Sequence, residues 1–168
     1  MRIYVDTGPV LAYVIENDPN HYRARKILDS ARSEEFVISE ISVLEMLSVL
    51  SRNLNYINID YKFPEIISVE DKVKIIVAYC VKKLNLKILY TRWKTRKLFV
   101  SGVGFNVSDI VYQASKLATK LGLRTLDLLH IVLAWRLNAD MFLTLDNDII
   151  GKSEIIRNML GIEVAGFS

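Results

Sequence analysis

Two apolar runs, far apart in the chain, each end on an aspartate, a position from which carboxylates can bind a metal ion. The run that begins at Arg2 ends on Asp6, and the run that begins at Met141 ends on Asp146. Short β-branched and aromatic runs of this kind indicate buried strands of a parallel sheet. Ligands bind at the carboxyl ends of strands in open α/β sheets, so both aspartates are predicted to face one site. Taken singly, Asp6 is also typical of a helix N-cap and Asp146 of an Asx turn.

Two further acids lie on predicted helices. Glu45 is the only charged residue between Ile41 and Val49, and a carboxylate on so apolar a helix is costly unless it is paired or binds a metal. The structural alternatives for Glu45 are a capping box with Ser42 or an exposed stripe on a buried helix. Asp127 lies in the first turn of its helix, where the helix dipole favours a negative charge for structural reasons alone. We predict that both acids join the two strand-end aspartates.

The four acids together predict a bound cation, because carboxylates brought close together in a dry pocket repel one another strongly. A hard divalent ion removes this repulsion, and a site made of oxygen ligands suits Mg²⁺ or Mn²⁺ better than Zn²⁺. His21 and His130 do not have the spacing of zinc ligands, and Cys80 lies in an apolar helix. We therefore predict that His130 packs between helices or supports the ligands from behind.

These acids can meet only if the chain alternates between strands and helices. Five runs have the character of short buried strands: 3–6, 36–39, 86–89, 141–145 and 162–165. Helices are predicted over 10–16, 21–31, 42–52, 72–84, 108–121, 125–137 and 153–160. Thr125 is the expected N-cap of one helix, and the stretch from Ser101 to Gly104 is expected to interrupt the chain. The predicted fold is therefore α/β, with three layers in α/β/α order around a central, mainly parallel sheet of about five strands.

Composition and length predict one globular domain over residues 1–168. Hydrophobic residues make up 51% of the chain and charged residues 24%, which excludes a disordered protein. Cys80 is the only cysteine, so no intrachain disulfide can form and a reducing compartment is expected. No apolar run approaches the ~20 residues of a membrane-spanning helix, and the first residues lack the pattern of a secretory signal. We therefore expect a cytoplasmic protein without a membrane partner.

The basic charge is unevenly spread along this mildly basic chain, whose net charge is +3. Residues 82–97 read KKLNLKILYTRWKTRK, with seven lysines and arginines and no acid. Cations interleaved with Tyr90 and Trp93 can hold an RNA backbone and stack on an unpaired base. The alternative is a solvated strand edge protected by lysines. The residues predicted to contact RNA are Lys82, Lys83, Lys87, Arg92, Lys94, Arg96 and Lys97.

Four motifs in order along the chain resemble those of PIN-domain ribonucleases. They are Tyr4-Val-Asp6-Thr-Gly-Pro-Val-Leu-Ala, Ser39-Glu-Ile-Ser-Val-Leu-Glu45, Leu126-Asp127-Leu-Leu-His-Ile-Val-Leu-Ala134 and Ala139-Asp-Met-Phe-Leu-Thr-Leu-Asp146. The chain is similar over nearly its whole length to the VapC-type toxins of toxin–antitoxin pairs. The resemblance implies an acidic quartet, a polar neighbour of the metal and a further acid after the last motif. In that order, these residues are Asp6, Glu45, Asp127 and Asp146, then Thr7, then Asp148.

The resemblance also implies an activity and partners. The activity is Mg²⁺- or Mn²⁺-dependent hydrolysis of RNA phosphodiester bonds, in which one or two ions activate a water molecule. A toxin implies a protein antitoxin, and members of this family are commonly homodimers. One segment, 53–107, is longer than expected for a minimal VapC-type protein and contains the basic stretch.

Three alternatives belong to other functional classes. Asp6-Thr-Gly8 matches the triplet of aspartic proteases, but those enzymes carry the aspartate on a loop of an all-β fold. A phosphatase of the haloacid-dehalogenase type has an acid two residues after its nucleophile, where this chain has Gly8. A PIN-like module that binds RNA or a partner protein without cleaving RNA is the third alternative. Cleavage of RNA that requires Mg²⁺ or Mn²⁺, and that EDTA abolishes, separates an enzyme from such a module.

Overall fold

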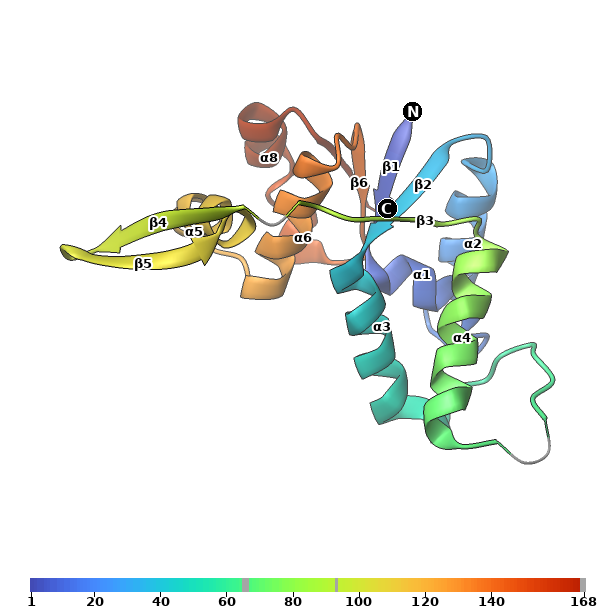
Figure 1. Ribbon diagram of the computed structural model, residues 1–168. Helices are drawn as coiled ribbons and strands as arrows, with labels where there is room; N and C mark the ends of the chain where they lie inside the picture. The colour runs from blue at the N-terminus through green and yellow to red at the C-terminus, as the bar shows by residue number, and fades with distance from the viewer. Residues whose placement is uncertain (65–66, 93, 167–168) are drawn as a thin grey trace.

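A five-stranded parallel sheet forms the centre of the protein. The computed structural model describes residues 1–64, 67–92 and 94–166 (Figure 1). The strands of the sheet are β1 (Arg2–Val5), β2 (Glu35–Ser39), β3 (Lys87–Leu89), β6 (Met141–Leu143) and β7 (Glu163–Ala165). They lie in the order β3-β2-β1-β6-β7, and every neighbouring pair is parallel. The predicted sheet of about five parallel strands is confirmed.

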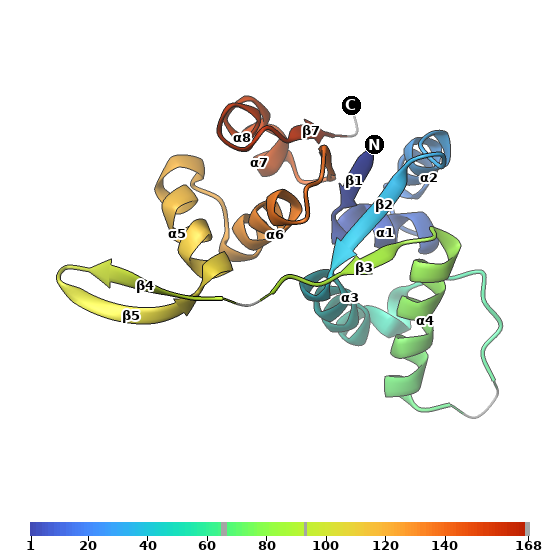
Figure 2. The same ribbon diagram turned by 45° about the horizontal axis from the view of Figure 1, so that its top comes forward.

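Helices cover both faces of this sheet, which confirms the predicted three layers (Figure 2). One face is covered by α1 (Thr7–Val14), α2 (His21–Ser30), α3 (Glu40–Asn53) and α4 (Val69–Lys83). The other face is covered by α5 (Asp109–Leu121), α6 (Thr125–Arg136), the short α7 (Asn147–Ile150) and α8 (Ser153–Leu160). A 3₁₀ turn, η1 (Leu54–Tyr56), follows α3. Within the described ranges, no helix is both long and apolar enough to cross a membrane.

The two hydrophobic cores follow from the alternation of side chains along each strand. In β1, Ile3 and Val5 pack under α1–α4, whereas Tyr4 packs on the opposite face under α5–α8. In β6, Leu143 and Phe142 divide between the same two cores. Strands with apolar residues on both faces must be covered on both sides, which is why α/β layering suits this sequence.

Two of the helix caps that the sequence suggested are wrong. The structural alternative for Glu45 was a capping box with Ser42, but the N-cap of α3 is Ser39, whose side chain pairs with the backbone of Ser42 in a capping box. Glu45 is therefore free of a capping role. We expected Thr125 to be the N-cap of α6, but Thr125 is its first helical residue and Arg124 occupies the cap position. The Arg124 side chain makes no capping bond to the helix backbone and pairs with the side chain of Asp127 instead.

An antiparallel hairpin, formed by β4 (Thr95–Val100) and β5 (Val103–Ser108), was not predicted. It projects away from both layers (Figures 1 and 2). The stretch expected to interrupt the chain is its turn, where Ser101 and Gly102 both have positive φ. At its base, Arg96 forms an ion pair with the buried carboxylate of Asp109, the first residue of α5. The hairpin is thus fixed to the body by charge at one end.

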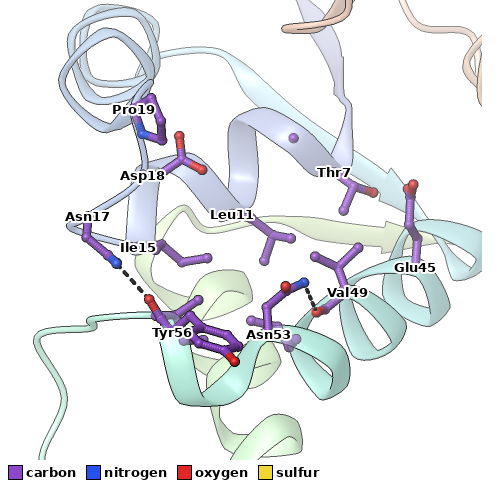
Figure 3. A pocket seen from close by; sticks show the side chains of 13 residues that line it. Thr7, Leu11, Ile15, Asn17, Asp18, Pro19, Glu45, Val49, Asn53 and Tyr56 are labelled. Carbon is purple, nitrogen blue, oxygen red and sulfur yellow. Dashed lines mark hydrogen bonds between the residues drawn. The ribbon is translucent and has the colours of Figure 1, made fainter.

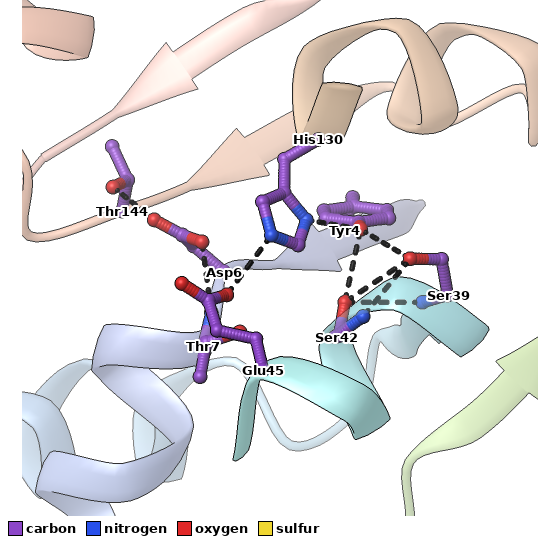
Figure 4. A network of polar contacts seen from close by, with 8 residues as sticks. All are labelled: Tyr4, Asp6, Thr7, Ser39, Ser42, Glu45, His130 and Thr144. Carbon is purple, nitrogen blue, oxygen red and sulfur yellow. Dashed lines mark hydrogen bonds and ion pairs between the residues drawn. The ribbon is translucent and has the colours of Figure 1, made fainter. Parts of the chain in front are cut away.

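A buried polar network joins β1 to α3 and α6 (Figure 4). The hydroxyl of Tyr4 lies 2.8 Å from Nδ1 of His130, 2.9 Å from Oγ of Ser39 and 3.0 Å from Oγ of Ser42. Nε2 of His130 lies 2.9 Å from a carboxylate oxygen of Glu45. An ionised carboxylate can only accept, so Nε2 donates to it, and in the neutral imidazole Nδ1 then accepts from Tyr4. Burial raises the pKa of Tyr4, which keeps the phenol protonated and able to donate.

We expect Tyr4→Phe to lower the free energy of unfolding by about 1–3 kcal/mol, because it leaves buried polar groups without a partner. Chemical denaturation measures this change. Tyr22→Phe is the control, since Tyr22 is exposed and its loss should change stability by less than about 0.5 kcal/mol. Equal stability of the two variants would mean that the network does not hold the fold together.

Candidate metal centre

Four of the predicted acids, Asp6, Glu45, Asp127 and Asp146, line one cavity near the carboxyl ends of β1 and β6, where the strand order changes direction. From β1 the chain continues to β2 on one side of the sheet, whereas β6 continues to β7 on the other side. Asp6 follows β1 directly, and its backbone N–H donates to the carbonyl of Leu143 in β6 at 2.9 Å. Asp146 lies three residues beyond Leu143. Such a point, where connections diverge, is the usual ligand-binding crevice of an α/β sheet.

Asp6 is both a helix cap and a half-buried member of this site. Its Oδ1 accepts from the backbone N–H of Thr7 at 2.8 Å, which caps α1. Its Oδ2 accepts from the hydroxyl of Thr144 at 2.7 Å. Burial raises the pKa of Asp6 in spite of these bonds. The structural alternative for Asp6, a helix N-cap, is therefore present, and a nearby cation would favour its charged form.

Glu45 projects from α3 toward Asp6 (Figure 4). Burial raises the pKa of Glu45, but the neighbouring His130 and Thr7, together with nearby positive charge, lower it by more, so the net shift is downward. One ligand atom each from Asp6, Glu45 and His130 lie within 4.8 Å of one another. His130 is buried and its two nitrogens face Glu45 and Tyr4, and its support of a ligand from behind stays a prediction.

The hydroxyl of Thr7 offers a further oxygen at this site. Its side chain is buried, and the oxygen has no partner in good hydrogen-bond geometry among the described residues. The hydroxyl points toward Glu45 (Figure 3). A buried oxygen without such a partner calls for a water molecule or an ion, and carboxylates beside a hydroxyl are the donor set of a hard divalent cation. The residues present therefore fit Mg²⁺ or Mn²⁺.

Asp127 and Asp146 lie across the same cavity, where Arg124 bridges them. Nε of Arg124 is 3.0 Å from Oδ2 of Asp127, and a terminal nitrogen of Arg124 is 2.5 Å from Oδ2 of Asp146. These contacts raise the pKa of Arg124. The cavity has a volume of about 440 Å³. Its lining residues are Asp6, Gly8, Glu45, Arg124, Leu126, Asp127, Leu145 and Asp146.

The remaining predicted acid, Asp148, has a structural role. Its backbone N–H donates to Oδ1 of Asp146 at 2.8 Å, so Asp146 caps α7 in the manner of an Asx turn. The Asp148 side chain is exposed, and it does not belong to the described lining of the acidic cavity. Asp148 thus positions Asp146 through its backbone, and a direct role at the metal stays a prediction.

A second, mostly apolar cavity of about 430 Å³ adjoins the acidic one (Figure 3). Gly8 and Glu45 line both cavities, so the two lie side by side. The walls between α1 and α3 include Leu11, Ile15 and Val49.

The predicted RNA-contacting residues are divided among several elements. Lys82 and Lys83 end α4, Lys87 lies in β3, Arg92 and Lys94 lie between β3 and β4, and Arg96 and Lys97 lie in β4. Lys87 forms an ion pair with Glu35 at 2.7 Å, and Arg96 is held by Asp109. None of the seven belongs to the described lining of the acidic cavity. Tyr90 is exposed, and Trp93 lies outside the described residues. Their contact with RNA stays a prediction.

Three groups of the site were not predicted from the sequence. Arg124 precedes Asp127 by three residues, and Thr144 precedes Asp146 by two. Closeness in sequence to a candidate acid was therefore the only signal that could have pointed to Arg124 and Thr144. Tyr4 and His130 are 126 positions apart in the sequence, so no local sequence pattern could have predicted their contact.

Two solved structures share this fold. A crystal structure of VapBC2 from Rickettsia felis, bound to a DNA fragment from its promoter, matches at 16% identity and a TM-score of 0.56, covering 98% of this chain and 99% of that one. A crystal structure of VapC20 from Mycobacterium tuberculosis, a toxin that cleaves the sarcin–ricin loop, matches at 14% identity and a TM-score of 0.58. That match covers 89% of this chain and 93% of VapC20.

A search among curated proteins gave no match. The sequence model of the PIN domain matches residues 3–154, which is most of the chain and includes all the acids of the site. Both the shared fold of the VapC structures and the match to the PIN-domain model agree with the PIN-like motifs found in the sequence. The chain therefore belongs to the PIN-domain family.

Proposed function

We propose that this protein is a divalent-metal-dependent endoribonuclease that hydrolyses RNA phosphodiester bonds. The observation that carries the proposal is the convergence of Asp6 and Glu45 with Asp127 and Asp146 on one cavity at the switch point of the sheet. The buried hydroxyl of Thr7, which points toward Glu45, and the membership of the PIN-domain family support it. An all-oxygen site of this charge favours Mg²⁺ or Mn²⁺.

Each residue has a part in this proposal. Bound Mg²⁺ or Mn²⁺ would supply a water molecule of lowered pKa and neutralise charge on the scissile phosphate. Asp6, Asp127 and Asp146 would hold the metal directly or through water. Glu45, kept ionised and oriented by His130, would bind the metal or accept a hydrogen bond from the attacking water. No covalent intermediate with the protein is needed.

We further propose that the protein is the toxin of a toxin–antitoxin pair, acts in the cytoplasm and forms homodimers. The shared fold with VapC20, and with VapBC2 in complex with DNA, supports this proposal. A nuclease active in the cell needs an inhibitor, so we expect a small antitoxin gene beside this one. Co-expression of its product should allow growth that the nuclease alone prevents, and toxicity unchanged by any neighbouring gene product would argue against a toxin.

We expect Asp6→Asn to reduce Mn²⁺-dependent cleavage of RNA by at least about a hundredfold, because even groups that only support metal ligands are worth 10–100-fold. The fold should persist, since asparagine caps helices as well as aspartate does. Asp60→Asn is the control, because Asp60 is exposed and lies outside this cavity. EDTA should abolish cleavage by the wild type. Full activity of Asp6→Asn would refute the assignment, and absence of activity in every form would leave the binding module as the better account.

We expect RNA affinity to fall as salt rises, because phosphate contacts release counterions. In EDTA, which prevents cleavage, the double variant Lys94→Ala/Lys97→Ala should bind RNA more weakly than the wild type. The slope of log affinity against log salt should shrink by about 0.7 for each phosphate that the variant no longer neutralises. Lys26→Ala/Lys120→Ala removes the same charge from α2 and α5 and is the control. Identical slopes for both variants would exclude these hairpin residues from the RNA interface.

We expect the apolar cavity to receive the base of a nucleotide that flanks the cleaved bond. Val49→Trp fills this cavity from α3 and should weaken a preference for the base at that position, while cleavage itself continues. Sequencing the ends of cleaved RNA from a randomised pool measures the preference. Val111→Trp, on the exposed face of α5, is the control. An unchanged preference in Val49→Trp would show that the base lies elsewhere.

A further inference from the structure

Arg124 is the one cation among the described residues that line the acidic cavity. It occupies the N-cap position of α6, but its side chain makes no capping bond. About 70% of its side chain is exposed, and its guanidinium reaches back over the cavity to two carboxylates. Its movement would therefore not disturb the helix that carries Asp127.

The bonds of Arg124 use oxygens that a metal ion would need. Oδ1 of Asp146 already accepts from the backbone N–H of Asp148, and Oδ2 of Asp146 accepts from Arg124. Oδ2 of Asp127 accepts from Arg124 as well. A divalent ion bound to the same oxygens would also repel the guanidinium at short range. The ion and Arg124 therefore compete for Asp127 and Asp146.

The acids of the cavity fall into two groups. Asp6, Glu45 and His130 form a group whose ligand atoms lie within 4.8 Å of one another, and Asp127 and Asp146 are not members of that group. The latter two are drawn instead to the guanidinium at 3.0 and 2.5 Å. Arg124 thus pairs with two of the four proposed metal-binding acids, Asp127 and Asp146.

We propose that Arg124 is a positioning residue that competes with the divalent ion for Asp127 and Asp146 and, once the ion displaces it, binds a phosphate of the RNA substrate. This inference rests on the proposed metal-dependent nuclease activity. A substrate phosphate enters a cavity lined by four carboxylates and one arginine, so a cation is needed on its path. A guanidinium suits this role, because its planar donors bind phosphate through two parallel hydrogen bonds.

The proposal predicts opposite effects on metal binding and on catalysis. Arg124→Ala should bind Mn²⁺ about tenfold more tightly than the wild type, which corresponds to about 1.4 kcal/mol. At saturating Mn²⁺, the same variant should cleave RNA more slowly, because the phosphate has lost its guanidinium. Arg124→Lys should restore part of the cleavage rate, since an ammonium still binds phosphate but cannot bridge the two carboxylates as a fork.

Isothermal titration calorimetry with Mn²⁺, in the absence of RNA, directly tests whether Arg124 competes with the metal ion. Arg157→Ala is the control for net charge, because Arg157 is an exposed arginine that pairs with Glu163 at 2.9 Å on another part of the surface. The expected result is tighter Mn²⁺ binding in Arg124→Ala alone. Unchanged or weaker binding in that variant would overturn the competition and leave the metal centre standing.

Two other outcomes also decide the matter. If neither the wild type nor Arg124→Ala binds Mn²⁺, both the metal centre and the competition are wrong. If Arg124→Ala binds Mn²⁺ more tightly but cleaves RNA at the wild-type rate when saturated, the competition stands and the phosphate role is wrong.

Discussion

Parallel pairing of β1 with β6 is the constraint on which the site depends. The register that places Val5 opposite Leu143 brings the residues after both strands to one edge, although they are about 140 positions apart in sequence. A slip of one residue would turn the side chains of a strand to the opposite face. Because Tyr4 and Phe142 are buried on one face and Val5 and Leu143 on the other, both cores oppose such a slip. The position of Asp6 is therefore set by hydrophobic packing.

Acids gathered in this way need a balancing charge, and the protein supplies part of it. His130 donates a hydrogen bond to Glu45, and the imidazole is itself fixed by the hydroxyl of Tyr4. Arg124 neutralises Asp127 and Asp146 from the other side of the cavity. The half-buried Asp6 is left with neutral partners, and burial raises its pKa. The strongest demand for a cation is thus beside Asp6.

The sequence was sufficient for the sheet and for the candidate acids, because both leave local signals. Apolar runs that stop at Asp6 and Asp146 predict strands and their ligand edge from neighbouring residues alone. The hairpin of β4 and β5 was missed because Ser101 and Gly102 interrupt its apolar residues, and because the exposed side chains of Phe99, Val100 and Val103 leave no alternation of buried and exposed positions. The cap of α3 was misplaced by three residues, since serines at 39 and 42 offer the same local chemistry. Helix boundaries are decided by tertiary packing as much as by propensity.

The contacts of Arg124 could be predicted only in part from the sequence. Its spacing to Asp127 is that of neighbours on one helix turn, but its contact with Asp146 spans 22 residues and depends on how α6 meets the end of β6. Anomalous diffraction from crystals grown with Mn²⁺ is the decisive measurement for the metal centre. We expect a manganese peak bound by oxygens of Asp6 and Glu45 together with Asp127 or Asp146, with the Arg124 guanidinium moved away. A peak at another place, or none at saturating Mn²⁺, would contradict it.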